Sequence, residues 1–228
     1  MELADVIDKV QKLLNLANSS DKPGEVATAQ LMAQKLITKY QLEEAQLHGR
    51  IKSDDITSMT VPIADPYFID KATLLNSIAL PNFCKVLRGN DHCVVYGYHS
   101  DIELCVALYR ALEVHMVSEM QDKLALAKKL APEHVHANTW AKSFFAGYAI
   151  SIGERIKQAK SETIEDAGTA GSSLELVLRD KQHAIENYWQ KLVKDRGSKR
   201  KLTSISGYQA GKESAATADL NQTKIESE

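Results

Sequence analysis

The stretch that most constrains the fold of this chain spans residues 93–120, CVVYGYHSDIELCVALYRALEVHMVSEM. At its start Val94, Tyr96 and Tyr98 occupy every second position, a period that is typical of a β-strand. Farther along, apolar side chains recur every three or four residues, as on one face of an α-helix. They are Ile102, Cys105, Val106, Tyr109, Leu112, Met116, Met120 and Leu124. A long amphipathic helix must bury this face, so other elements are expected to cover it.

The turn between this strand and the helix contains Ser100 and Glu103, which fit a capping box. We expect Ser100 to begin the helix and its hydroxyl to accept a hydrogen bond from an otherwise unpaired amide. Asp101 would then lie in the first turn, where the helix dipole favours a carboxylate. The alternative is an exposed Asp101 that lines a site beside Tyr98 and His99.

Two further strands are expected. Residues 83–88 and 92–98 flank a Gly-Asn-Asp turn, which is typical of a β-hairpin. Residues 58–64 also alternate, but Pro62 cannot donate a ladder hydrogen bond, so this strand is expected at an edge. Asp65-Pro66 predicts the start of a helix that ends before Pro81. A sheet of about three strands is marginal alone and needs helices on one face.

The N-terminal part predicts a helical hairpin. Residues 3–18 and 23–40 each carry an apolar face, and the short polar segment between them favours antiparallel packing. The whole pattern predicts an α+β, mostly helical protein, with this hairpin and a small antiparallel sheet packed against long helices. The expected domains are the hairpin at 1–48, an α+β core at 56–202 and a partly flexible C-terminal segment at 203–228.

The second half of the chain is expected to be helical with one linker. Residues 140–155 carry an aromatic stripe, and Gly147 on that stripe indicates the close approach of another element. Residues 161–171 are expected to form a flexible linker. Ser172 then opens a second capping box. Beyond Lys212 the polar tail is expected to fray.

Composition excludes several classes of protein. The 228 residues carry a formal charge of −2, so attraction to nucleic acid or to an anionic membrane would need a local patch. No apolar run approaches the roughly 20 residues of a membrane span. The acidic residues after Met1 do not resemble a secretory leader. Three widely spaced cysteines favour a reducing compartment. We therefore expect a cytoplasmic protein that does not enter membranes.

Several blocks of sequence also occur in a familiar order. A lysine- and leucine-rich helix, KVQKLLNLANSS at residues 9–20, precedes an alanine-rich helix that runs to Leu42. YGYHSDIELCVALYRAL at 96–112, WAKSFFAGYAISIGERI at 140–156 and GYQAGKESA at 207–215 follow. Together they resemble the family catalogued as domain of unknown function 2786 (DUF2786). The resemblance implies a phage or prophage protein, Mu-like members included, that works in the host cytoplasm. It implies no active site.

The EHVH sequence at residues 133–136 is a candidate metal site. In extended backbone His134 and His136 point the same way and can share a metal. His115, His99 or a carboxylate would supply a third ligand. Histidines in a solvated loop are the simpler interpretation, because the chain contains no HExxH motif and no cysteine pair. No cofactor is expected.

Cys84, Cys93 and Cys105 are the candidate nucleophiles. Cys84 and Cys93 could be cross-strand neighbours, with His92 or His99 as the base that activates a thiol. The simpler interpretation is that all three are small buried hydrophobic residues.

A basic run near the end of the last core helix is the candidate nucleic-acid site. It contains Lys191, Lys194, Arg196, Lys199, Arg200 and Lys201. These cations could bind phosphates, with Tyr188 or Trp189 stacking on bases. The alternative is a solvated helix end, where cations suit the helix dipole.

We therefore predict a non-enzymatic accessory protein of phage or prophage type that binds nucleic acid or a host protein through residues 191–202. One alternative is a metal-dependent hydrolase that uses His134, His136 and a carboxylate. Another is a purely protein-binding module that presents the N-terminal helical hairpin.

Overall fold

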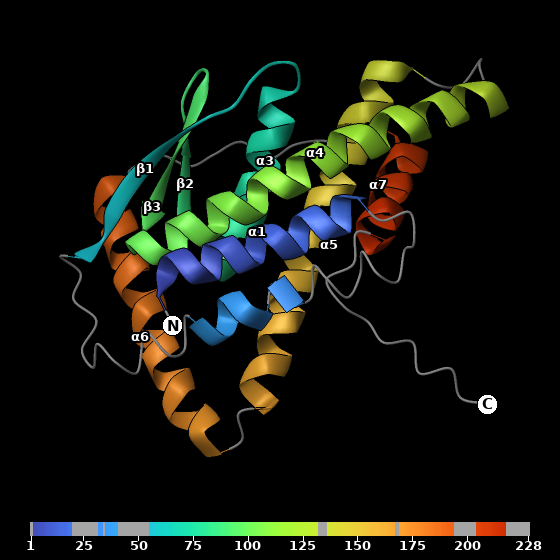
Figure 1. Ribbon diagram of the computed structural model, residues 1–228. Helices are drawn as coiled ribbons and strands as arrows, with labels where there is room; N and C mark the ends of the chain where they lie inside the picture. The colour runs from blue at the N-terminus through green and yellow to red at the C-terminus, as the bar shows by residue number, and fades with distance from the viewer. Residues whose placement is uncertain are drawn as a thin grey trace, which may run out of the picture.

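The computed structural model describes residues 2–19, 32–33, 35–40, 55–131, 136–166, 169–193 and 204–217. In chain order the elements are α1 (Leu3–Ser19), β1 (Thr57–Pro62), α3 (Phe68–Ala79), the short 3-10 helix η2 (Leu80–Asn82), β2 (Lys85–Arg88), β3 (His92–Gly97), α4 (His99–Leu130), α5 (Ala137–Asp166), α6 (Thr169–Leu192) and α7 (Ile205–Thr217). Long helices dominate, and a small antiparallel sheet packs at one side of them (Figure 1). The predicted α+β, mostly helical class is confirmed.

The sheet has the strand order β1-β3-β2, and both neighbouring pairs are antiparallel. The turn between β2 and β3 closes with a hydrogen bond from the Gly89 amide to the His92 carbonyl, 2.9 Å long. β1 lies at an edge and Pro62 is its last residue, so the missing amide of proline interrupts no inner ladder. The predicted hairpin and edge strand are therefore confirmed.

Helix α4 is the central helix, as its sequence pattern predicts. Its buried apolar residues include Ile102, Cys105, Tyr109, Leu112, Met116 and Met120, while Val106 and Leu124 pack at the margin of the same core. Helices α1, α3 and α5 and strands β1 and β3 all pack against α4. Each large apolar side chain that is fully buried contributes about 1.5–3 kcal/mol. This stripe therefore accounts for much of the driving force for folding.

The N-terminal segment joins this core. In Figure 1, α1 lies along α4. Val6 and Val10 of α1 are buried, together with Ala33 and Ile37 from the helical residues 32–33 and 35–40. All four belong to the same hydrophobic cluster as the buried face of α4. The turn predicted between the two helices lies outside the described residues.

Helices α5 and α7 pack through glycines. A Cβ atom at Gly147 of α5 would clash with the carbonyl oxygen of Tyr208, and one at Gly211 of α7 would clash with that of Phe144. A Cβ atom at Gly207 would likewise meet the carbonyl oxygen of Trp140. Only glycine lets the two backbones come this close. The close approach predicted from Gly147 is thus confirmed, and the approaching element is α7.

Both predicted helix starts in the first half of the core are wrong by one or more residues. Helix α4 begins at His99, so Ser100 lies inside the first turn and is buried instead of capping the helix. Helix α3 begins at Phe68, after Tyr67 in a left-handed conformation with a φ of 73°. Asp65 and Pro66 therefore lie before the helix, three and two residues ahead of its first residue.

The predicted linker and the predicted fraying of the tail are also wrong in part. Helix α5 continues to Asp166 and α6 starts at Thr169, so most of residues 161–171 is helical and Ser172 does not cap α6. Helix α7 continues past Lys212 to Thr217. Ser214 and Ala215 are buried in this part of α7, because they face the other helices. Residues 218–228 lie outside the described part of the chain.

Candidate nucleic-acid interface

Alternate side chains of the three strands share the face of the sheet that points away from α4, and six of them lie away from its Pro62–His92 end. They are Ser58 and Thr60 on β1, Val94 and Tyr96 on β3, and Lys85 and Leu87 on β2. The alternate residues of β3 face the core: Cys93 and Val95 are buried, and a Cβ atom at Gly97 would point toward Ile102 of α4. Tyr96 is half-buried on the outward face, while Ser58, Thr60 and Leu87 are exposed.

The C-terminal turns of α6 cover one end of this outward face. The ring centres of Tyr188 and Trp189 lie 6.2 and 6.0 Å from that of Tyr96. Beside them the Lys85 Nζ lies 2.6 Å from the Glu186 Oε2, and this hydrogen bond lowers the pKa of the glutamate. We call Tyr96, Tyr188 and Trp189 the aromatic cluster. Each of the three side chains is half-buried, so part of each ring stays in solvent.

Of the predicted basic residues, the structure places Lys191. It is exposed in the last turn of α6, directly after the aromatic cluster. Lys194, Arg196, Lys199, Arg200 and Lys201 lie outside the described residues. The chain therefore enters its most basic stretch at the end of α6, next to half-buried aromatic rings and an exposed sheet face.

Inside the protein, charged side chains from three helices meet around the ring of Phe83. Asp101 of α4 is fully buried, and its Oδ2 lies 2.6 Å from the Nζ of Lys181 on α6. The Nζ of Lys160, on α5, lies 3.4 Å from the centre of the Phe83 ring and donates a 2.8 Å hydrogen bond to the Pro81 carbonyl. We call Asp101, Lys160 and Lys181 the buried charge cluster.

Asp101 lies in the first turn of α4, as predicted, but its burial contradicts the alternative of an exposed site residue. The carboxylate is buried because a lysine far along the chain supplies its counter-charge. Lys181 recurs at helical spacing with the buried Leu178 and Ile185, and a lysine within an apolar stripe is the one sequence signal of this contact. Nothing comparable marks Lys160.

All three cysteines are free and buried, which confirms the simpler interpretation. Cys84 and Cys93 are not cross-strand neighbours: Cys93 pairs with Arg88, and Cys84 precedes β2. Burial, followed by a hydrogen bond with Cys105, raises the pKa of the Cys84 thiol, and burial raises that of Cys93. A raised pKa keeps a thiol protonated and weakly nucleophilic.

The proposed bases and metal ligands are engaged elsewhere or exposed. His92 contacts the Asp91 carboxylate at 2.7 Å, and His99 lies 3.3 Å from that of Glu103. His136 is exposed just before α5. His134 lies outside the described residues, and within those residues no group of three or more His, Cys, Asp or Glu side chains could hold a metal. The His134/His136 site remains a prediction from the sequence.

His115, the other histidine considered as a metal ligand, lies between α4 and α5. Its Nδ1 is 3.0 Å from the Tyr148 hydroxyl. Burial lowers the pKa of His115, so the imidazole is neutral near pH 7. The position of this histidine in the helix interface indicates a structural role.

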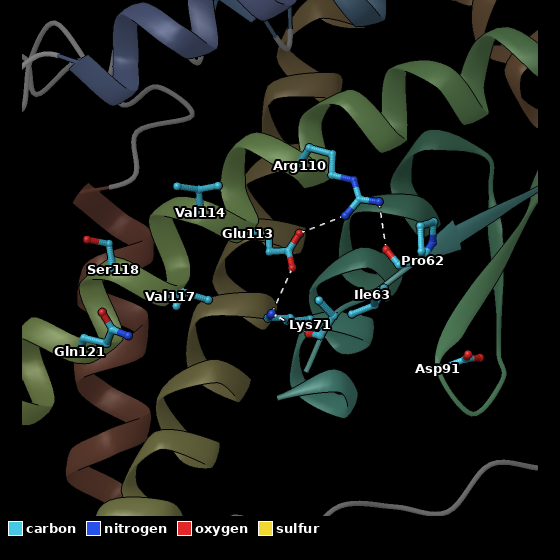
Figure 2. A pocket seen from close by; sticks show the side chains of 11 residues that line it. Pro62, Ile63, Lys71, Asp91, Arg110, Glu113, Val114, Val117, Ser118 and Gln121 are labelled. Carbon is cyan, nitrogen blue, oxygen red and sulfur yellow. Dashed lines mark hydrogen bonds and ion pairs between the residues drawn. The ribbon is translucent and has the colours of Figure 1, made fainter. Parts of the chain in front are cut away.

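A cleft of about 750 Å³ opens between the middle of α4, the start of α3 and the end of β1 (Figure 2). At one end Glu113 lies 3.4 Å from the Lys71 Nζ and 3.3 Å from the Arg110 Nη1. The two cations also donate to the carbonyls of Ala64 and Pro62, at 2.8 and 3.0 Å. Asp91 lines the cleft as well, so the cleft contains two cations, Lys71 and Arg110, and two carboxylates. The cleft therefore carries no excess charge that would select an anionic or a cationic ligand.

Comparison with known proteins bears on the N-terminal segment. Residues 5–44 match the family model described as protein of unknown function (DUF2786). The resemblance to DUF2786 is thereby confirmed over α1 and the helical residues before Gln41, and the later blocks lie beyond the match. No curated protein and no solved structure matches the chain significantly. The DUF2786 segment contributes Val6, Val10 and Ile37 to the common core. In the part of the chain that the structure describes, no helix could cross a membrane.

Proposed function

We propose that the protein binds nucleic acid where α6 ends on the outward face of the sheet, and that it does so as a non-enzymatic accessory protein. The binding residues are the aromatic cluster, Lys191 and the cations up to Lys201. The DUF2786 resemblance supports a phage or prophage origin, and the free cysteines support a reducing, cytoplasmic setting.

The observation that carries the proposal is the contact of Tyr188 and Trp189 with Tyr96. It brings three partly exposed rings together at the residue where the basic stretch begins. Stacking of one base on an aromatic side chain is worth about 1–3 kcal/mol and tolerates any sequence. Without the cations that follow them, the same rings would lie at a solvated helix end with nothing to attract a nucleic-acid strand.

Charge supports the same partner. The chain as a whole carries −2, yet residues 191–201 contain six lysines and arginines against one aspartate. Phosphates would therefore be attracted to this stretch and not to the protein in general. The proposal predicts binding that weakens as salt rises, because each neutralised phosphate releases counterions.

The test is a fluorescence anisotropy titration of the full chain with a labelled single strand of about 20 nucleotides, and with a duplex of that length, at several salt concentrations. The triple variant Lys199→Ala/Arg200→Ala/Lys201→Ala should weaken binding and reduce the salt slope by about 2 on the single strand and about 3 on the duplex. Trp189→Ala should weaken binding without changing that slope.

The matched control is Lys123→Ala/Lys128→Ala/Lys129→Ala, which removes three exposed cations from the C-terminal part of α4. It should leave binding unchanged if the location of charge matters. Absence of binding at low salt, or equal loss in the control and the triple variant, would refute the proposal. In that case capture of a host protein by the same segment is the function to test next.

A further inference from the structure

Strand β1 forms one edge of the sheet, and its pairing with β3 decides which of its backbone groups lie on that edge. Ile63, the residue after the strand, donates its amide to the Asp91 carbonyl on the side of β3, at 3.4 Å. In an antiparallel pair, successive residues direct their backbone groups alternately toward the partner strand and away from it. Ser58, Thr60 and Pro62 therefore direct their backbone groups away from β3.

One end of this edge is already closed. Pro62 has no amide hydrogen, and its carbonyl accepts a 3.0 Å hydrogen bond from the Nη2 of Arg110 (Figure 2). Earlier in the strand, Ser58 and Thr60 are exposed. Their outward N–H and C=O groups have no hydrogen-bond partner among the residues that the structure describes. A row of unpaired backbone groups at an edge is a template for another strand.

Charge distinguishes this edge from the opposite one. None of the six residues of β1 is charged, whereas β2, at the other edge, carries Lys85 and Arg88. Charged side chains, lysines above all, are a common device by which an edge strand keeps a second strand away. A second copy of the chain would bring the same two cations against β2 and no charge against β1. Self-association is therefore opposed by charge at the β2 edge but not at the β1 edge.

We propose that two copies of the chain associate through β1, paired antiparallel about a two-fold axis at Met59. Ser58 and Thr60 lie one residue on either side of Met59, so Ser58 of each copy pairs with Thr60 of the other through two hydrogen bonds. The four bonds satisfy every outward N–H and C=O group of these two residues. The half-buried Met59 side chains meet at the axis, on the face of the sheet that packs against α4.

Charges at the two ends of the strand favour the antiparallel arrangement. Asp55 is exposed two residues before β1, and the side chain of Arg110, at the other end, is 44% exposed. Antiparallel pairing brings Asp55 of each copy to the end of the ladder where Arg110 of the other copy lies. A guanidinium has five N–H groups, and those that Arg110 directs to Pro62 and Glu113 leave others for a second carboxylate. Parallel pairing would instead bring like charges together.

The association joins the two sheets into one of six strands, in the order β2-β3-β1-β1-β3-β2. Because Ser58 and Thr60 both lie on the outward face, this face continues across the axis. It then carries both aromatic clusters, and a nucleic-acid strand long enough to reach both gains affinity from simultaneous binding. This consequence rests on the proposed function, whereas the association does not.

Cysteine cross-linking of the full chain tests both the pairing and its register. Ser58→Cys protein mixed with Thr60→Cys protein brings two thiols directly opposite each other, with Cα atoms about 5.5 Å apart, which a disulfide can span. In either variant alone the thiols of the two copies are diagonal neighbours, about 7–8 Å apart. Under a mild oxidant the mixture should form covalent dimer several times faster than either variant alone.

Two controls accompany the mixture. Thr60→Cys mixed with Leu87→Cys should cross-link slowly, because Leu87 is equally exposed on the outward face but lies on β2, two strands from the axis. The wild type should not cross-link, because its three cysteines are buried.

Sedimentation velocity measures the association without an oxidant. The wild type should rise from the mass of one chain, 25.2 kDa, toward twice that mass as its concentration increases. Thr60→Pro removes an amide that faces solvent in the single chain, a place where an edge strand tolerates proline, and should stay monomeric. Thr60→Val keeps the amide and the β-branched side chain and should associate as the wild type does.

The proposal is overturned if the wild type keeps the mass of one chain at every concentration, or if the mixture cross-links no faster than its two components alone. If Thr60→Pro fails to fold, these two measurements decide. No nucleic acid is present in either of them. A failure to associate therefore leaves the proposed binding function intact, and a failure to bind nucleic acid leaves the association intact.

Discussion

Replacement of Gly211 by alanine should destabilise the protein, although alanine is the better helix former. In an exposed helix this change would gain about 1 kcal/mol. Here the new Cβ atom would clash with the Phe144 carbonyl oxygen of α5, and the carbonyl carbon and Cα of Phe144 also lie within 3 Å of it. Those neighbours are backbone atoms, so the clash can be relieved only by moving α7 away from α5.

Overpacking of this kind costs typically 1–3 kcal/mol. The loss also includes contacts made by the residues that α7 buries, among them Ala215 and Ser214, whose hydroxyl lies 3.1 Å from the Glu119 carboxylate. We expect Gly211→Ala to lose about 2 kcal/mol net, which lowers Tm by roughly 4–8 °C in a chain of this size.

Thermal unfolding followed by circular dichroism measures this change. The control is Gln209→Ala, an exposed position on the same helix that should alter Tm little. A further check is Gly147→Ala combined with Gly211→Ala: the double variant should lose less than the sum, because either methyl group already separates the helices. An unchanged or higher Tm for Gly211→Ala would refute the close backbone packing of α5 and α7.

Three other predictions concern buried polar groups. Asp101→Asn removes the carboxylate that faces Lys181, so it should lower the free energy of unfolding, measured by urea denaturation, by about 3–5 kcal/mol. A second substitution, Lys181→Met, should restore most of this loss. A loss below about 1 kcal/mol would contradict the buried pair. Because burial lowers the pKa of His115, stability should fall as pH drops below about 6.5 toward that lowered value, and His115→Gln should lose less stability over that interval than the wild type. The three thiols should resist a disulfide reagent such as DTNB in the native protein and react rapidly in denaturant; rapid reaction of the native protein would contradict their burial.

The elements that the sequence predicts correctly are those whose pattern is local and apolar. The stripe from Ile102 to Met120 has the three-to-four-residue period of an α-helix, and the hairpin around Gly89 has the two-residue period of strands. Each pattern is specific to one kind of element. The buried face of α4 follows directly from the first of these. The position of β1 at an edge follows from one residue, Pro62, which cannot donate a hydrogen bond.

The misplaced features depend on contacts between distant parts of the chain. Ser100 and Glu103 form a good capping pattern, but α4 starts one residue earlier, at His99. Asp101 is buried beside Lys181, which is eighty residues away in sequence. Helix α7 is held by Gly207 and Gly211, whose small size leaves no apolar period to detect.

For the same reason, only part of the candidate site could be predicted from the sequence. Its cations and Trp189 form a recognisable local pattern. Its third ring, Tyr96, lies about ninety residues earlier in the chain, on a strand whose sequence carries no sign of a binding site. The register that turns Tyr96 outward is set only when the strands pair.

The DUF2786 segment buries Val6, Val10, Ala33 and Ile37 against a helix that starts at His99. Excised and expressed alone, it would present these side chains to water and should aggregate or stay unfolded. The remainder of the chain would in turn lose the cover on one side of α4. Recombination that transplants this segment into another protein would therefore have to transplant a matching α4 with it.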